Sequence, residues 1–242
     1  MSLLDLLQYR RSVRYYDPDK PLDSEKVRHC LQQATLSPSS SNMQLYEFYH
    51  ITDKSTLQQL AHACFNQQPA TTAQQMVVFV VRQDLYRQRA TEVMAMEQEN
   101  VKRTSPPEKQ ASWLKAKERY YGWLMPFIYA RCCGLLGVFR RTIALLVHYF
   151  RPIQVDASEA DMRIVSHKSC GLAAQTFMLA MAENGYDTCP MEGLDSLRVK
   201  NILKLPRGAE INMIVACGIR KDGRGIWGER TRLPFDKIYK HI

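Results

Sequence analysis

The stretch "ASEADMRIVSHKSCGLAAQTFMLAMAENG" at residues 157–185 decides the fold class of this 242-residue chain. It contains no proline, and Gly185 stands where a helix would end, so the stretch predicts one long helix. Several small residues occupy its second half: Gly171, Ala173, Ala174, Ala180 and Ala182. Side chains of this size let another helix approach closely, which predicts a fold with several packed helices.

Three apolar segments on either side of this helix predict strands. They are "YEFYHIT" (46–52), "QMVVFVVR" (75–82) and "EINMIVACGIR" (210–220). The first alternates aromatic and β-branched residues with others, and the second is a continuous apolar run of strand length. Because helical patterns separate the strands, we predict an α+β fold with one sheet and helices around it.

Shorter helices are expected between and beside these strands. Their approximate ranges are 2–10, 24–34, 54–65, 85–119 (interrupted by "SPP" at 105–107) and 194–205. Asp23 or Ser24 is expected to cap the second helix. The first helix is amphipathic, and its leucines at 3, 4, 6 and 7 are expected on a buried face. We treat residues 1–242 as a single domain with an atypical apolar and basic insertion at about 100–155.

The composition is that of a globular protein with anionic partners. The chain has 33 Lys and Arg against 24 Asp and Glu, which gives a formal net charge of +9. Such an excess favours a phosphate-bearing cofactor, nucleic acid or an anionic membrane surface. The 7 cysteines form no Cys-x-x-Cys motif, and the N-terminus lacks the pattern of a signal peptide. We therefore expect a cytoplasmic protein.

The common signatures of nucleophilic, metal and nucleotide sites are missing from the sequence. No Walker A lysine motif, Gly-x-Ser-x-Gly elbow or zinc-like spacing occurs, so we expect no metal and no catalytic side chain. The string "GRGIWG" at 223–228 matches Gly-x-Gly-x-x-Gly, but too little chain follows it for a βαβ unit. We interpret its glycines as turn residues.

Four segments rich in hydrogen-bond donors remain as candidate sites. They are "RRSVR" (10–14), "SPSSSNMQ" (37–44), "GYDTCPMEG" (185–193) and "GERTRLP" (228–234). Arginine presents a planar fork of donors that suits phosphate oxygens. Each segment also has a plainer interpretation. These are a solvated helix end, a polar loop, a turn between two helices and a basic tail, in that order.

Taken together, the order and spacing of these segments resemble the FMN-dependent nitroreductase family. "QYRRSVRYYDPDKPLDSEKV" resembles its Arg-Arg/His-Ser-x-Arg/Lys opening, and "ATLSPSSSNMQLYEFYHI" resembles its Pro-Ser-Ser-x-Asn-x-Gln segment. "GLAAQTFMLAMAENGYDTCPMEG" resembles the family's long helix and following turn, and "RTRLP" its Lys/Arg-x-Arg-x-Pro close. The match leaves out roughly residues 85–155. It implies a mostly antiparallel sheet flanked by helices, in an intertwined homodimer with FMN at the dimer interface.

The resemblance also implies which residues contact FMN. Arg10, Arg11, Ser12 and Arg14 would contact the phosphate, the ribityl chain and the pyrimidine edge of FMN. Arg230 and Arg232 would also bind the phosphate. The partner subunit would supply Pro38, Ser39, Ser40, Asn42 and Gln44, while Pro190, Met191, Glu192 and Gly193 would lie along one face of the ring. Asn66 would also reach the ring, but the family's lysine three residues later is replaced by Pro69. Arg14 is then the cation expected nearest the pyrimidine.

A flavin brings its own two-electron chemistry, which explains the lack of a catalytic acid, base or nucleophile. The activity implied by the resemblance is ping-pong transfer of hydride from NADH or NADPH through FMN to a nitroaromatic, a quinone or a similar small acceptor. Two alternatives stay open. One is a specialised flavin enzyme of the same superfamily, such as a reductive dehalogenase or a flavin-consuming enzyme. The other is a basic module that binds membrane or nucleic acid without redox activity.

The segment "YYGWLMPFIYARCCGLLGVFRRTIALLVHYFRP" (120–152) is unlike the rest of the family. No acidic residue lies between Glu118 and Asp156, and the segment's charged residues are all arginines. It could be a lid and dimer contact, an interfacial element with its arginines at headgroups and Trp123, Phe127, Tyr129 and Phe139 in the acyl boundary, or a nucleic-acid surface. The interfacial interpretation of 120–151 would place the protein on the inner face of the membrane.

Overall fold

A four-stranded antiparallel sheet forms the centre of the molecule in the computed structural model, which describes residues 2–242. The strand order is β1-β2-β4-β3, with β1 Tyr46–Ile51, β2 Gln75–Val81, β3 Asp187–Met191 and β4 Glu210–Gly218. The α+β class, the antiparallel sheet and three of the strands confirm the predictions. The fourth, β3, lies in the segment that we expected to be a turn.

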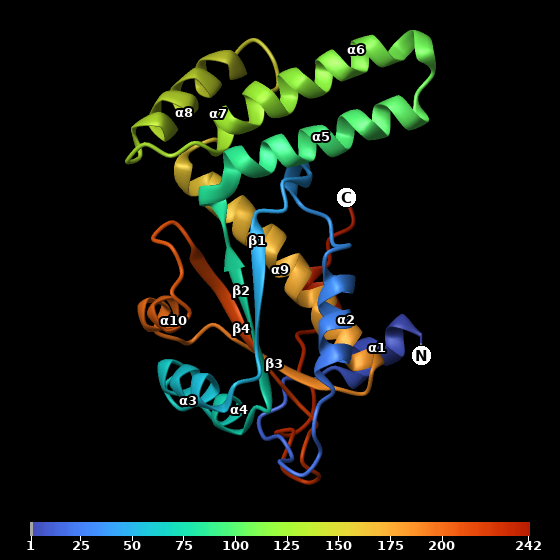
Figure 1. Ribbon diagram of the computed structural model, residues 1–242, viewed down its shortest axis with the longest axis vertical. Helices are drawn as coiled ribbons and strands as arrows, with labels where there is room; N and C mark the ends of the chain where they lie inside the picture. Colours follow the sequence, from blue (N-terminus) through green and yellow to red (C-terminus); the bar gives the residue numbers. More distant parts are fainter. Residues whose placement is uncertain (1) are drawn as a thin grey trace.

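Helices cover both faces of the sheet (Figure 1). One face carries α2 Ser24–Ala34 and the long helix α9 Glu159–Glu183, and the other carries α3 Lys54–Ala63, α4 Gln68–Thr72 and α10 Ser196–Ile202. Strand β2 lies between the two layers: Phe79 packs with α9, while Val78 packs on the α3 side. Both faces of β2 are therefore dry, which explains its unbroken apolar sequence.

A group of helices projects beyond one end of the sheet (Figure 1). It consists of α5 Tyr86–Thr104, α6 Pro107–Lys117, the π-helix Glu118–Leu124, α7 Met125–Tyr129 and α8 Leu135–His148. We call these residues, 86–148, the helical arm. Its base shares a buried cluster with the body of the molecule, in which Tyr121, Met125 and Tyr129 pack with Met43 and Met162. Among the described residues, no helix has the length and apolarity to cross a bilayer.

The first helix, α1 Leu3–Tyr9, forms where it was predicted, but its buried face was wrong. The side chains of Leu3, Leu4 and Leu7 are exposed, because α1 lies at the edge of the molecule, against α9 and the C-terminal segment. The chain then runs beside the sheet, where Tyr16 pairs with Arg220 just after β4. Gly218 makes this approach possible, since a Cβ there would lie 2.4 Å from the Tyr16 ring.

The C-terminal segment returns to the start of the chain. After β4 it makes turns with positive φ at Gly223 and Gly228, as expected for "GRGIWG", and ends in the exposed helix α11 Phe235–Ile238. Residues 228–230 of this segment therefore lie against residues 8–11, close to β3.

Candidate functional site

An extended strip of chain after α1 forms one wall of the candidate site. Ser12 pairs in parallel with Thr188 of β3, and the Val13 amide donates to the Thr188 carbonyl at 3.1 Å. On the other side, the Arg14 amide donates to the carbonyl of Gly225 at 2.7 Å. "RRSVR" is thus not a solvated helix end, because its backbone is held between a sheet edge and the C-terminal segment.

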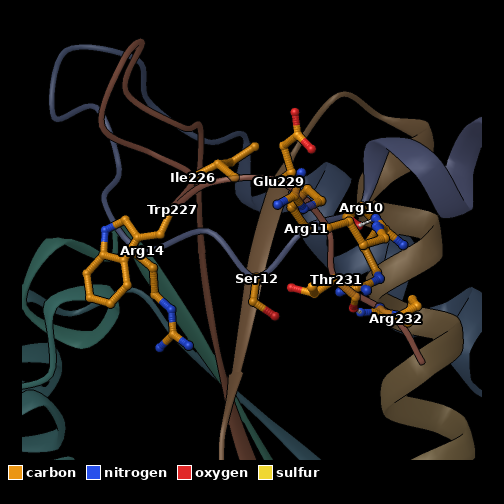
Figure 2. A pocket seen from close by; sticks show the side chains of 10 residues that line it. Arg10, Arg11, Ser12, Arg14, Ile226, Trp227, Glu229, Thr231 and Arg232 are labelled. Atoms are coloured by element: carbon orange, nitrogen blue, oxygen red, sulfur yellow. Dashed lines mark hydrogen bonds between the residues drawn. The ribbon is translucent and has the colours of Figure 1, made fainter. Parts of the chain in front are cut away.

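A cavity of about 280 Å³ opens between this strip and the C-terminal segment (Figure 2). Six residues named from the sequence line it: Arg10, Arg11, Ser12, Arg14, Arg230 and Arg232. Four others that the sequence reasoning missed complete the lining: Ile226, Trp227, Glu229 and Thr231. The structure therefore brings together two arginine groups from opposite ends of the chain. We call this cavity the arginine cavity.

Arginine side chains fasten the C-terminal wall of the arginine cavity to its N-terminal wall. Arg11 Nη2 donates to the carbonyl of Gly228 at 2.9 Å. Arg230 Nη2 donates to the carbonyls of Gln8 and Arg10, at 3.2 and 2.6 Å. These bonds use only part of each guanidinium, so further donors remain for a ligand.

The charge in the arginine cavity is unbalanced. Its lining holds five arginines and a single carboxylate, that of Glu229. Burial lowers the pKa of Arg10, and the nearby charges of Arg230, Arg232 and Arg11 lower it further. The Arg10 Nε is buried and has no hydrogen-bond partner among residues 2–242. A buried unpaired donor among like charges is unfavourable, so this cavity favours an anion with several acceptor oxygens.

Arg14 stands apart from the other arginines. Figure 2 shows it beside Trp227, with Ser12 between this pair and the group formed by Arg10, Arg11 and Arg232. The Arg14 guanidinium lies over the Trp227 ring, 5.4 Å from its centroid. Such a cation–π contact orients the cation without neutralising it. The signal missed in the sequence was a tryptophan within a glycine-rich turn, where it has no core to fill.

Residues 190–193 lie next to the arginine cavity but do not line it. The segment is the end of an edge strand: Pro190 pairs with Val215 of β4, and Met191 is buried. A proline is accommodated here because an edge strand pairs on one side only. Glu192 and Gly193 emerge from the strand into solvent. The expected turn was wrong because sheet pairing with β4 takes over this short stretch.

A second loop approaches the end of β3. Gln67 Nε2 donates to the carbonyl of Gly193 at 2.7 Å, which joins the loop after α3 to the strand end. Asn66, named from the sequence, is exposed in this loop with a φ of 51°. Pro69 follows within α4 and is buried. Gln67 was missed because only its fold position, not its sequence motif, places it beside Gly193.

The remaining sequence-named residues, Pro38, Ser39, Ser40, Asn42 and Gln44, lie elsewhere. They surround the short 3₁₀ helix Ser40–Asn42 at the end of the sheet opposite the arginine cavity (Figure 1). The Ser40 amide donates to Ser169 of α9, whereas Tyr9, beside the arginine cavity, donates to Gly185. Fourteen helical positions separate Ser169 from Glu183, the last residue of α9, a distance of about 21 Å along the axis. Within one chain, the loop 38–44 is therefore too far from the arginine cavity to contact the same ligand.

The loop 38–44 is instead joined to the helical arm. The hydroxyls of Ser41 and Tyr120 lie 2.8 Å apart, and Tyr121 donates to the Ser41 carbonyl at 3.1 Å. The first part of the atypical segment, residues 120–129, is thus a packed neighbour of this loop. Tyr129 and Arg140 are buried, so they cannot lie in an acyl boundary or at headgroups as the interfacial interpretation had placed them.

The sequence profile of the nitroreductase family matches residues 7–219. The chain belongs to this family. Among curated relatives, it is 28% identical over 241 residues to "Protein DrgA" of Synechocystis sp., covering 98% of this chain and 95% of that protein. It is 27% identical to the Bacillus subtilis protein named "Putative NAD(P)H nitroreductase YdgI", covering 98% and 96%.

Solved structures share the fold. One is the Bacillus subtilis protein described as "putative nitroreductase ydfN", with a TM-score of 0.73 at 20% identity, covering 99% of this chain and 98% of that one. Another is a nitroreductase-like structure in complex with FMN from Exiguobacterium sibiricum, with a TM-score of 0.70 at 19% identity, covering 100% and 98%. The predicted family and the nitroreductase fold are thereby confirmed.

Proposed function

We propose that this protein is an FMN-dependent oxidoreductase that passes hydride from NADH or NADPH to a nitroaromatic, a quinone or a similar small acceptor by a ping-pong mechanism. The arginine cavity is the observation that carries the proposal, because its unpaired Arg10 Nε and surplus charge call for a phosphate-like anion. Family membership, the FMN complex of one structural neighbour and the names of the relatives support the same assignment.

The residues present fit an FMN phosphate. A dianionic phosphate offers acceptors for Arg10 Nε and for the free donors of Arg230 and Arg232, and its charge offsets their mutual repulsion. The Ser12 hydroxyl lies between Arg14 on one side and Arg10, Arg11 and Arg232 on the other, and it would hydrogen-bond the sugar chain next to the phosphate. This arrangement fixes one end of the cofactor with the strongest charge pairs that the site offers.

The flavin ring would lie on the Arg14 side of Ser12, away from the phosphate. Arg14, oriented by Trp227, would place a fixed positive charge at the pyrimidine edge. The strand end at Glu192 and Gly193, joined to Asn66 by Gln67, would provide a backbone shelf along one ring face. When bound, FMN supplies the two-electron chemistry, so the protein's residues hold, orient and polarise it rather than act as acid or base.

A second copy of the chain would complete the site. The loop at Pro38, Ser39, Ser40, Asn42 and Gln44 lies too far from the arginines of its own chain, so we assign it to the FMN of the partner in a homodimer. Tyr120, hydrogen-bonded to Ser41 of that loop, would then lie at the open face where an acceptor enters.

We also propose that residues 1–242 form one domain, because the buried cluster at the base of the helical arm joins the arm to the rest of the molecule.

The test uses the purified full chain, with and without added FMN. After excess flavin is removed, the protein should be yellow, should be bleached anaerobically by NADH or NADPH, and should regain its colour with nitroaromatics or quinones. Initial rates with donor and acceptor varied together should give parallel double-reciprocal lines. A protein that stays colourless after incubation with FMN refutes the cofactor, and a loaded protein that neither nucleotide reduces refutes the reaction.

A further inference from the structure

Helix α8 is held in the helical arm by its polar and small side. Arg140 is buried and donates to the carbonyls of Phe127, Ala130 and Ala157, at 2.7, 3.0 and 3.0 Å. Gly137 lies so close to the start of α9 that a Cβ there would be 2.5 Å from the Glu159 backbone nitrogen. These contacts fix the rotation of α8 about its axis, so its opposite side must face outward.

The side that faces outward is apolar. Six large side chains on it are between 55% and 90% exposed: Leu135, Val138, Phe139, Leu146, Tyr149 and Phe150. Their spacing of three and four residues forms one stripe along α8 and the turn after it. We call this stripe the α8 outer face. Contiguous apolar surfaces of this kind in soluble domains mark contacts with other molecules or with membranes.

The charged side chains within residues 135–151 are all arginines. Arg141 and Arg151 are exposed and form no ion pair with any residue in 2–242, while no carboxylate occurs between Glu118 and Asp156. In the adjoining segment, Asp161 accepts hydrogen bonds within the N-terminal cap of α9. The face therefore combines an apolar stripe with two exposed arginines that form no ion pair among residues 2–242, although the charge of Arg141 contributes to lowering the pKa of Asp161.

We propose that the α8 outer face docks onto an anionic lipid bilayer, with α8 lying in the plane of the interface. An amphipathic helix with aromatic and aliphatic side chains and flanking arginines binds such a surface through both apolar burial and charge. A second copy of the chain is a poorer occupant, because a twofold contact would bring together two faces whose own charged residues are all arginines. A bilayer of anionic lipids offers headgroups with which both exposed arginines can pair.

The proposed lipid contact involves only part of the segment 120–151. Tyr121, Met125 and Tyr129 belong to the buried cluster at the base of the arm and are not available to lipid. Arg140 is committed to three backbone carbonyls. Only residues 135–151, after the loop that begins at Ala130, present the apolar stripe and the free arginines together.

The experiment is flotation of the full-length protein with vesicles of phosphatidylcholine alone and of equal parts phosphatidylcholine and phosphatidylglycerol. The wild type should float with the anionic vesicles at low salt, and less at high salt, which screens surface charge. The double variant Leu146→Asp/Phe150→Asp should lose vesicle affinity about tenfold or more. Arg141→Gln and Arg151→Gln should each lose about fivefold, the equivalent of one surface cation.

Matched controls separate this contact from general effects. Leu197→Asp changes an equally exposed leucine on α10, and Arg103→Gln changes an exposed arginine on α5; both should bind vesicles as the wild type does. Light scattering on every variant reports its oligomeric state. The proposal is overturned if the wild type does not float, if it floats equally with neutral vesicles, or if Leu146→Asp/Phe150→Asp floats as well as the wild type. If the wild type does not float and the α8 variants dissociate its oligomer, the α8 outer face is a contact with a second copy of the chain instead.

Discussion

Replacing Arg10 by methionine should separate the affinity for FMN from the stability of the fold. Methionine keeps much of the apolar stem but removes the guanidinium, whose Nε is buried without a partner and whose pKa is lowered by burial and by Arg230, Arg232 and Arg11. In the cofactor-free protein this charge is unfavourable. A buried unpaired donor costs about 1–3 kcal/mol, and about 1 kcal/mol shifts Tm by roughly 2–4 °C in a chain of this size. The Arg10→Met apoprotein should therefore melt at or above the wild-type Tm.

The same substitution should weaken FMN binding through the phosphate alone. A hydrogen bond to a charged group contributes about 1.5–3 kcal/mol, which corresponds to about a 13- to 160-fold increase in Kd. Riboflavin has the same ring and sugar chain without the phosphate, so its affinity should not change. Titrating both flavins against apoprotein by fluorescence quenching measures the two Kd values directly. Arg28→Gln, on the exposed side of α2, is the control.

Two results would refute this reasoning. If Arg10→Met weakens riboflavin and FMN equally, Arg10 does not hold the phosphate. If FMN affinity is unchanged and the apoprotein Tm falls, the arginines of the cavity stabilise the fold rather than a ligand. A combined loss that differs from the sum of the single losses in an Arg10→Met/Arg230→Met cycle would show that the two guanidinium groups are coupled, as expected if both hold one anion.

Other predictions concern stability and reactivity. Gly137→Ala should cost about 1–3 kcal/mol in urea unfolding, because its Cβ would meet backbone 2.5 Å away, whereas Val138→Ala beside it should be nearly neutral. Hydrogen bonding from His167 and from two arginines lowers the pKa of Glu210 to about 2. The stability that Glu210 contributes is therefore complete above its unfolded-state pKa of 4.5 and is lost as the pH falls toward 2. Glu210→Gln should flatten the plot of unfolding free energy against pH in this range. Ellman's reagent should label Cys132 and Cys133 rapidly in the native protein, and rapid labelling of more thiols would contradict the burial of the others.

Most of the fold was predictable because its main elements carry local signals. Strand β2 has an apolar residue at nearly every position since it is covered on both faces, and the α9 helix is long, free of proline and ended by a glycine with positive φ. The β3 strand "DTCPM" carries no such signal, because an aspartate and a proline occupy a strand of five residues. Its pairing with β4 is a tertiary contact that no window of sequence contains.

The site was predictable in part, and for a different reason. Composition and charge indicated only that anions would bind, and the resemblance to a family linked Arg10 with Arg230 before any distance was known. What the sequence could not give was the role of residues defined by position alone. Trp227 matters because it lies under Arg14, and Gln67 matters because it reaches Gly193. The leucines of α1 show the opposite limit, since an amphipathic pattern does not say whether its own chain covers it.

The contact between Arg230 and the Arg10 carbonyl joins residues that are 220 positions apart in the sequence. The sheet and α9 take most of their packing partners from residues 13–219, so these contacts do not need the segment that carries Arg230. The arginine cavity, in contrast, takes its second wall from residues 226–232. Binding of the cofactor would then depend on the docking of this C-terminal segment, and release of the segment would open the site while the sheet stays intact.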